Sequence, residues 1–239
     1  MINFEIEKIA PLCAEFQVDL TEEIKEKLNL YGNLLLEWNE KINLTAIKDP
    51  QGVLYKHFYD CILFFKNVKV PLNSAVIDVG TGAGFPGMVL KIIRPDLKVT
   101  LLDSLNKRLV FLNEVISALS LEGIKTVHSR AEDSGKNKLY RERYDIATAR
   151  AVASMPILLE YCLPLVKKGG QFVAMKGPNA LEELSGCENC LKTLGGEKPT
   201  VFTETLTGDE ERVFLICKKI SQSPSKYPRK PSDISKQPL

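Results

Sequence analysis

A glycine-rich turn directly after a short apolar run constrains the fold of this chain more than any other feature. Residues 76–87 read Val-Ile-Asp-Val-Gly-Thr-Gly-Ala-Gly-Phe-Pro-Gly, and a second apolar run, 99–102, ends at Asp103. The pattern predicts a strand, a tight turn, a helix and a second strand with a carboxylate at its tip. Such a unit binds nucleotide-like cofactors, because the glycines let the backbone approach the ligand and the acid accepts hydrogen bonds from ribose hydroxyls.

Two ligands compete for this turn, a dinucleotide such as NAD and S-adenosylmethionine. The run 82–87 satisfies the dinucleotide pattern G-x-G-x-x-G, but it starts beyond the expected strand end at Val79. When Gly80 is aligned with the strand end instead, Phe85 stands where the third glycine belongs. Asp78 would repel a pyrophosphate, whereas it is compatible with the sulfonium and ammonium groups of S-adenosylmethionine. The turn therefore favours S-adenosylmethionine.

The rest of the chain divides into a helical part and an alternating part. Residues 1–70 read as helices, with Asp19 or Thr21 as a cap for the first long one and Asp49 as a cap before Pro50. Strands are then predicted at 75–79, 99–102, 124–128, 144–149 and 171–175. A first helix is predicted from near Pro86 to Pro95, and a second begins after Ser104 as its cap, with Leu105 facing inward. Two further helices are predicted at 155–166 and 179–194. Residues 167–170 are expected to end the former, and residues 195–196 the latter.

The final segments, 200–206 and 212–218, flank a Gly-Asp-Glu turn and predict an antiparallel hairpin. Strands alternating with helices imply a parallel sheet covered on both faces. We therefore expect an α/β fold of the class I methyltransferase type, with a Rossmann-like, mostly parallel sheet and a C-terminal antiparallel hairpin. The expected organisation is an N-terminal helical segment (1–70), an S-adenosylmethionine-binding domain (71–220) and a basic tail (221–239).

Composition excludes several classes of protein. The chain is 44% hydrophobic and has no apolar run long enough to cross a bilayer, and its acidic N-terminus does not resemble a secretory signal. Six scattered cysteines suit reduced thiols, so a cytoplasmic location without a membrane is expected. Cys187 and Cys190 form a C-x-x-C without a second pair or a nearby histidine, so no metal site is expected.

The net charge of +2 conceals a basic C-terminus. Residues 218–239 hold six basic side chains against one acid. Two interpretations are open, a contact with a polyanion such as RNA and a solvated terminus that aids solubility. The candidate RNA-binding residues are Lys218, Lys219, Lys226, Arg229 and Lys230.

Ligands of such sheets bind outside the carboxyl ends of the strands, which locates the candidate site. Asp103 suits the ribose diol, or alternatively the start of a helix. Ala131 and Glu132 follow the third strand, beside the expected adenine, or form a solvated loop. Arg150 ends the fourth strand and suits a phosphate, a carboxylate or a guanine edge, or else it forms an ion pair with Asp103 or Glu132. Lys176 ends the fifth strand.

One absence among the motifs is also informative. The fourth strand ends in Thr-Ala-Arg-Ala, without the Asn/Asp-Pro-Pro-aromatic turn that serves exocyclic amines and without a Pro-Cys nucleophile. A ring nitrogen with a free lone pair, such as guanine N7, needs neither a base nor a covalent step, because alignment with the methyl group largely suffices.

These motifs, taken together, resemble one family. They are Trp38-Asn39-Glu40-Lys41-Ile42-Asn43-Leu44-Thr45, His57-Phe58-Tyr59-Asp60, residues 78–87, Arg130-Ala131-Glu132, Arg150-Ala151-Val152-Ala153, Lys176-Gly177 and Tyr227-Pro228-Arg229-Lys230-Pro231. They are similar to those of the bacterial 16S rRNA guanine-N7 methyltransferases, also called the glucose-inhibited division protein B family. The similarity covers nearly the whole chain, and Cys61, where a serine is expected, is one departure.

The resemblance implies a cytoplasmic, monomeric enzyme that uses S-adenosylmethionine to methylate N7 of one guanine in 16S rRNA or the small ribosomal subunit. With the turn, it implies cofactor contacts at Asp78, Gly80, Gly82, Gly84, Phe85, Asp103, Ala131, Glu132 and Arg150. No catalytic residue is assigned; the candidates for substrate positioning are Arg150, Lys176, Asn39 and His57. The competing hypothesis is a non-enzymatic RNA- or ribosome-binding module with a methyltransferase-like fold.

Overall fold

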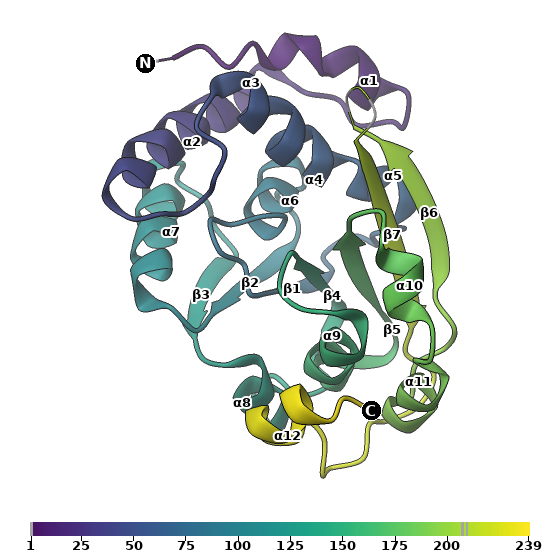
Figure 1. Cartoon of the computed structure of the whole chain (residues 1–239). Coiled ribbons are helices and arrows are strands. Elements are labelled where there is room, and N and C mark those ends of the chain that lie inside the picture. The colour runs from purple at the N-terminus through teal and green to yellow at the C-terminus, as the bar shows by residue number, and fades with distance from the viewer. Residues whose placement is uncertain (1, 207, 209) are drawn as a thin grey trace.

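A twisted, mostly parallel β-sheet forms the centre of the computed structural model, which describes residues 2–206, 208 and 210–239 (Figure 1). Within these residues the strands stand in the order β3-β2-β1-β4-β5-β7-β6, with β1–β5 parallel and β6 and β7 antiparallel. The strands are β1 (Ala75–Val79), β2 (Lys98–Asp103), β3 (Ile124–His128), β4 (Tyr144–Arg150), β5 (Val166–Lys176), β6 (Thr200–Thr205) and β7 (Glu211–Lys218). The predicted fold class, including the C-terminal hairpin, is confirmed.

Both faces of the sheet are buried, and neighbouring strand residues serve opposite cores. Val76 packs into one hydrophobic cluster while Ile77 packs into the other, and Leu101 and Leu102 divide in the same way. This alternation follows from the period-two geometry of a strand. It explains why these strands carry apolar residues on both faces, as in parallel sheets with helices on both sides.

Helices cover the two faces in separate groups (Figure 1). One core receives the N-terminal helices together with α6 and α7; the other receives α9, α10 and α11. The bounds in the first group are η1 (Ile6–Lys8), α1 (Ala10–Ala14), α2 (Glu22–Lys41), α3 (Pro50–Val53), η2 (Leu54–Tyr59), α4 (Asp60–Ile62), α5 (Phe64–Asn67), α6 (Gly87–Ile93) and α7 (Asn106–Ala118). The remaining helices are α8 (Ala131–Lys136), α9 (Met155–Cys162), η3 (Leu163–Leu165), α10 (Ala180–Leu184), α11 (Glu188–Leu194) and α12 (Pro231–Lys236). None of the helices in the described residues has the length and apolar character needed to cross a membrane.

The N-terminal helices share their core with the sheet. The Oγ1 of Thr21 accepts a hydrogen bond from the Ile24 N–H at the start of α2, and the Asp49 carboxylate accepts one from the Gly52 N–H. Of the two expected caps for α2, Thr21 is therefore the one used. Leu28 and Leu35 of α2 are fully buried in the same cluster as the sheet residue Val76.

Three of the expected helices differ from the structure. The helix from Met155 ends at Cys162, and residues 167–170 lie in β5, where a bulge shifts its register against β4. A Cβ on Gly170 would lie 2.5 Å from the carbonyl oxygen of Asp145, so this glycine permits a close strand contact and does not end a helix. Helix α7 begins without a side-chain cap, and Leu105 before it is exposed. The helix expected over 179–194 is divided into α10 and α11.

Candidate functional site

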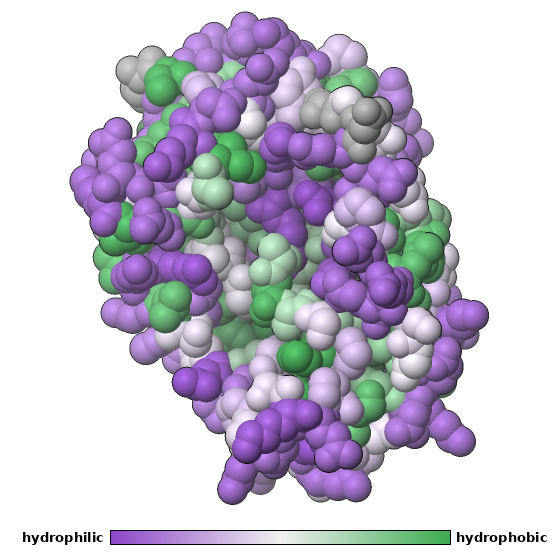
Figure 2. Space-filling model, in the orientation of Figure 1, coloured by the Kyte–Doolittle hydropathy of each residue, from purple (hydrophilic) through white to green (hydrophobic). Residues whose placement is uncertain are grey.

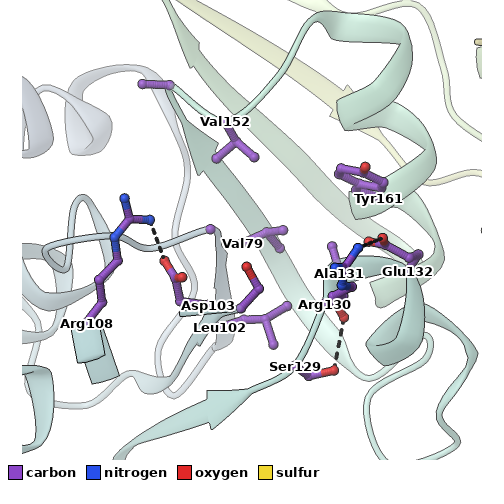
Figure 3. A pocket seen from close by; sticks show the side chains of 13 residues that line it. Val79, Leu102, Asp103, Arg108, Ser129, Arg130, Ala131, Glu132, Val152 and Tyr161 are labelled. Carbon is purple, nitrogen blue, oxygen red and sulfur yellow. Dashed lines mark hydrogen bonds and ion pairs between the residues drawn. The ribbon is translucent and has the colours of Figure 1, made fainter. Parts of the chain in front are cut away.

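The first cavity lies at the carboxyl ends of β1, β2 and β3 and has a volume of about 390 Å³ (Figure 3). Its lining includes Gly80, Asp103 and Glu132, three of the predicted cofactor contacts, together with Val152 and Tyr161. The predicted strand ends therefore converge on one hollow, as expected for a parallel sheet whose strands all point the same way.

The glycine turn runs along the edge of this cavity with left-handed backbone angles. Gly80, Gly82 and Gly84 have φ values of 69°, 60° and 105°, a region that residues with a side chain rarely adopt. A Cβ on Gly80 would lie 2.7 Å from Cγ2 of Val152, whereas a Cβ on Gly82 would meet only a backbone oxygen at 3.9 Å. The turn is thus tightly packed at its start and open at its middle, which leaves its backbone accessible to a ligand.

Asp78 supports the turn from beneath and is fully buried. Its Oδ2 accepts hydrogen bonds from the Thr81 hydroxyl at 2.6 Å and from the Gly87 N–H, the first of α6, at 2.9 Å. Its Oδ1 has no hydrogen-bond partner among the described residues. Burial raises the pKa of Asp78 to about 6. The position at the start of α6 where a phosphate would bind is therefore filled by a carboxylate of the protein itself.

Asp103 ends β2 and connects the turn to the next helix. Its Oδ2 accepts from the Gly82 N–H at 2.9 Å and from Nη1 of Arg108 at 3.3 Å, and its Oδ1 accepts from the Leu105 N–H at 2.8 Å. Figure 3 shows the side chains of Asp103 and Arg108 directed toward each other at the rim of the cavity. Oδ1 retains room for another donor, so both open alternatives for Asp103, ribose ligand and helix start, are compatible with its position.

Ala131 and Glu132 form the far wall of the first cavity, at the start of α8. The Glu132 side chain is nearly buried, and its closest charged partner is Arg130 at 4.0 Å. Tyr161 of α9 lies across from it (Figure 3). A buried carboxylate with so weak a partner is an acceptor available for a polar ligand group.

A second cavity of about 390 Å³ lies beside the glycine turn and shares Gly80 and Arg108 with the first. It is lined by Phe85, His57 and Arg150, and the face shown in Figure 2 is hollowed near its middle, among hydrophilic residues. The His57 ring stacks on Phe85 with centroids 4.3 Å apart, and the guanidinium carbon of Arg150 lies 5.0 Å from the same ring. The N-terminal segment and the sheet domain therefore build this cavity together.

Arg150 is held by groups that the sequence did not identify as its partners. Its Nη1 donates to Asp60 at 2.7 Å and to the carbonyl oxygen of Lys56 at 3.0 Å, so the ion pair expected with Asp103 or Glu132 is not formed. Arg212 of β7 donates to the other oxygen of Asp60 at 2.6 Å. Asp60 and Arg212 are thus site residues that sequence reasoning missed; the nearest signal was the motif His57-Phe58-Tyr59-Asp60.

His57 lies in a π-helical turn, η2, a distortion that is frequent at functional sites. Its Nδ1 lies 3.0 Å from Nη2 of Arg150 and 3.1 Å from the carbonyl oxygen of Lys56, and its Nε2 lies 2.8 Å from Oγ1 of Thr45. Burial, and then the charge of Arg150, lower the pKa of His57 to about 3. His57 is therefore a neutral group that orients Arg150.

Asn39 has a structural position next to this cavity. Its Oδ1 accepts from the Leu44 and Thr45 N–H groups at 2.7 and 2.9 Å, and its Nδ2 donates to the Thr45 carbonyl at 2.9 Å. These bonds close the loop after α2 and place Thr45 under His57. Asn39 supports the second cavity, whose lining includes Thr45.

A third cavity of about 260 Å³ lies between the end of β5 and α10, and Lys176 is part of its lining. The Lys176 Nζ donates to the Ala153 carbonyl at 2.9 Å and pairs with Glu183 at 2.7 Å. Ala151 lines all three cavities. Its φ of 55° is left-handed, a strained conformation that is concentrated at functional sites.

The C-terminal tail is part of the folded body, which corrects two of its expected RNA contacts. Lys219 is 1% exposed, and its Nζ donates to the carbonyls of Leu163 at 2.8 Å and Leu194 at 3.0 Å and to the Ser223 hydroxyl. Arg229 forms a bidentate pair with Glu160, which has no exposed surface. Both cations therefore satisfy buried acceptors and are not free to meet RNA.

The other three predicted tail contacts lie on the surface. Lys218, Lys226 and Lys230 are exposed. The tail also packs on α8, since a Cβ on Gly135 would lie 2.6 Å from Pro228. The interpretation of the tail as a merely solvated terminus does not fit this packing. Removal of the tail would uncover part of the cavity wall that carries Glu132.

Among the described residues, no three His, Cys, Asp or Glu side chains gather as metal ligands would.

Comparison of the sequence with known proteins identifies close relatives. The model of the family described as rRNA small subunit methyltransferase G matches residues 24–212. Ribosomal RNA small subunit methyltransferase G of Clostridium perfringens (strain 13) is 48% identical over 240 residues, which is 100% of both chains. The protein of the same name from Acetivibrio thermocellus is 52% identical over 94% of this chain and 92% of its own.

Comparison of the structure supports the fold class. A point mutant of the 16S rRNA (adenine(1408)-N(1))-methyltransferase from Catenulisporales acidiphilia has a TM-score of 0.51 at 16% identity and covers 66% of this chain and 88% of its own. TYW2 of M. jannaschii in complex with AdoMet has a TM-score of 0.55 at 13% identity and covers 73% and 80%. At these identities the likeness concerns the fold, a class I methyltransferase sheet.

Proposed function

The chain belongs to the rRNA small subunit methyltransferase G family, and from this premise we propose that it transfers a methyl group from S-adenosylmethionine to N7 of a guanine in 16S rRNA. The substrate is free 16S rRNA or the small ribosomal subunit. We expect the enzyme to act as a monomer in the cytoplasm.

The three predicted contact regions fit this donor. The first cavity offers Asp103 for the ribose hydroxyls and Ala131 and Glu132 for the adenine, and the glycine turn between them has an accessible backbone. In the second cavity, Nε and one Nη2 hydrogen of Arg150 have no hydrogen-bond partner among the described residues. These two hydrogens form one edge of the guanidinium, which suits the donor's carboxylate as a bidentate partner.

One observation favours this donor over a dinucleotide, namely the hydrogen bond from the Gly87 N–H to Asp78. In dinucleotide sites the helix N-terminus receives the pyrophosphate. Here that N–H is already satisfied, and the occupying group is an acid, so a second anion would be repelled. A donor without phosphate groups meets no such penalty.

The residues around the turn position the donor and stabilise its charged groups. When bound, S-adenosylmethionine supplies an electrophilic methyl group on a sulfonium. The N7 lone pair would form the new N–C bond while the C–S electron pair would remain on sulfur, so guanine would take up the positive charge. No proton must be removed, which agrees with the neutral, buried His57 and with the pairing of Glu210, the one acid among the described residues that line the second cavity, to Lys56. Arg150 and Phe85 would hold the methionine end, and alignment provides most of the rate enhancement.

Methyl transfer to rRNA tests this proposal directly. Purified protein is incubated with methyl-labelled donor and either 16S rRNA or small subunits, and the RNA is digested to nucleosides. The expected product is labelled 7-methylguanosine. A protein that binds rRNA, but neither binds S-adenosylmethionine by calorimetry nor labels the RNA, would instead be the non-enzymatic module.

A further inference from the structure

The third cavity contains none of the proposed donor contacts, and it shares Ala151 and Arg212 with the second. Resting on the proposed function, we infer that this cavity receives the target guanine and that Glu183 recognises its Watson–Crick edge. The inference assigns the base a place and identifies a specificity-determining residue for it.

The order of the cavities along the sheet supports this assignment. The first lies at β1–β3, the second beside the glycine turn, and the third at the end of β5, with Ala151 common to all. A donor that spans the first two ends next to Ala151. A base that enters the third therefore reaches the donor at the same residue.

The second cavity is poorly suited to the base because its lining is cationic. Lys56, Arg108, Arg150 and Arg212 line it against Glu210, whereas among the described residues the third cavity has only Lys176 and Arg212 against Glu183. Methylation of N7 makes the purine a cation, so fixed positive charge around the ring would oppose the transition state. That cavity suits anions, namely the donor's carboxylate or an RNA phosphate beside the target base.

The third cavity contains a carboxylate held in a fixed position. Oε2 of Glu183 accepts a hydrogen bond from the Met155 N–H at 2.9 Å and forms an ion pair with Nζ of Lys176 at 2.7 Å. Within the described part of the chain, Oε1 of Glu183 has no hydrogen-bond partner. A carboxylate that is anchored through one oxygen presents the other as an acceptor with a defined orientation.

Guanine matches this acceptor and adenine does not. Guanine has N1–H and an N2 amino group on the edge remote from N7, so with N7 toward Ala151 these donors lie deeper in the cavity, toward Glu183. Adenine has an unprotonated N1 at that place, which a carboxylate repels. Glu183 would thus attract the correct base and reject the wrong one, and its charge would stabilise the cation that forms on guanine.

The walls of the cavity leave room for a planar ring. Met175, Pro178 and Gly177 line it, and a Cβ on Gly177 would meet no atom within 4 Å. A side chain at residue 177, at the wall of the cavity, would therefore meet open space without displacing its neighbours. This glycine offers a way to block the cavity from within.

The first experiment measures base discrimination at the position that the wild-type enzyme methylates. Inosine, which lacks only the N2 amino group, is placed there by ligation of RNA fragments, in whichever form of the substrate the wild type accepts. We expect the wild type to prefer guanosine by about 10- to 100-fold in kcat/KM. Glu183→Gln should lower kcat/KM for guanosine by about 10- to 100-fold and bring the guanosine/inosine ratio near 1.

Glu182→Gln is the matched control, because Glu182 is an exposed acid on the same short helix. It should retain both the rate and the ratio, and both variants should bind S-adenosylmethionine like the wild type. A structural role of Glu183 at the start of α9 would lower thermal stability without changing the ratio. An unchanged ratio in Glu183→Gln, or a wild type that accepts inosine equally well, would overturn the inference while rRNA methylation still stood.

The second experiment fills the cavity. Gly177→Leu should abolish methyl transfer while leaving S-adenosylmethionine affinity and melting temperature near wild type, and Gly177→Ala should have a smaller effect. Full activity of Gly177→Leu would place the base elsewhere. If the wild type forms no 7-methylguanosine at all, the proposed function fails, and this inference fails with it.

Discussion

The Nη1 of Arg150 lies 2.7 Å from the carboxylate of Asp60, a side chain with no exposed surface. The pair connects the N-terminal helical segment with the end of β4, across 90 residues of sequence. Because the carboxylate and the Lys56 carbonyl occupy both Nη1 hydrogens, the plane of the guanidinium is fixed and its other edge is directed away from them. The N-terminal segment thus orients a candidate cofactor ligand that another part of the chain supplies.

Replacement of Arg150 tests this orientation. Arg150→Ala and Arg150→Lys should both lower kcat/KM strongly, by about 100-fold, since a lysine is a point charge and cannot reproduce the planar fork. Thermal stability should change little, because Arg212 remains as a partner for Asp60. Steady-state methylation and calorimetric donor binding are the measurements. Normal turnover of Arg150→Lys would show that charge alone matters.

Asp103 offers a second test, through donor affinity. Asp103→Ala should weaken S-adenosylmethionine binding by about 10- to 100-fold, because a hydrogen bond to a charged group contributes roughly 1.5–3 kcal/mol. Asp103→Asn, which keeps one of the two oxygens that accept from the Gly82 and Leu105 N–H groups, should lose less. Isothermal titration provides the constants, and equal affinity of the wild type and Asp103→Ala would assign Asp103 to the helix start alone.

His57 predicts a pH dependence of stability. Its pKa is about 3 in the folded protein and about 6.5 when unfolded, so below pH 6.5 the unfolded chain binds the proton more readily. Stability should therefore fall as pH decreases from 6.5 toward 3, by roughly 1.4 kcal/mol per pH unit from this group, and be fully present above 6.5. Urea unfolding between pH 4.5 and 7.5 measures it.

The control for that experiment is a variant that cannot titrate. His57→Gln should flatten the slope over this window, whereas replacement of the exposed His128 controls for loss of a surface histidine. Parallel curves for the wild type and His57→Gln would mean that other groups cause the acid loss.

The tail predicts two separable effects. Arg229→Ala leaves the buried Glu160 without its partner and should cost about 3–5 kcal/mol of stability.

Replacing Lys218, Lys226 and Lys230 by alanine should leave stability nearly unchanged but reduce the slope of log K for RNA against log salt, by about one for each phosphate that these lysines neutralise. An identical salt slope in the triple variant would exclude the tail from RNA binding.

Local patterns were sufficient for the sheet and for half of the site. The strands, the glycine turn, Asp103 and the Ala131–Glu132 pair each follow from a few consecutive residues, because strand ends and tight turns are specified locally. Asp60, Arg212 and Glu183 could not be found in this way, since their roles depend on which side chains meet across the fold. The same holds for Lys219: charge predicts exposure, and only the carbonyls of Leu163 and Leu194 around it explain its burial.

The hydrogen bond from the Gly87 N–H to Asp78 has a consequence for selection among metabolites. ATP, ADP and the nicotinamide dinucleotides carry the same adenosine as S-adenosylmethionine, so contacts to adenine and ribose cannot distinguish them. Their phosphates would have to compete with a carboxylate that is built into the turn. We therefore expect the protein to discriminate against adenine nucleotides by charge, because their phosphates, unlike the donor, would meet this carboxylate.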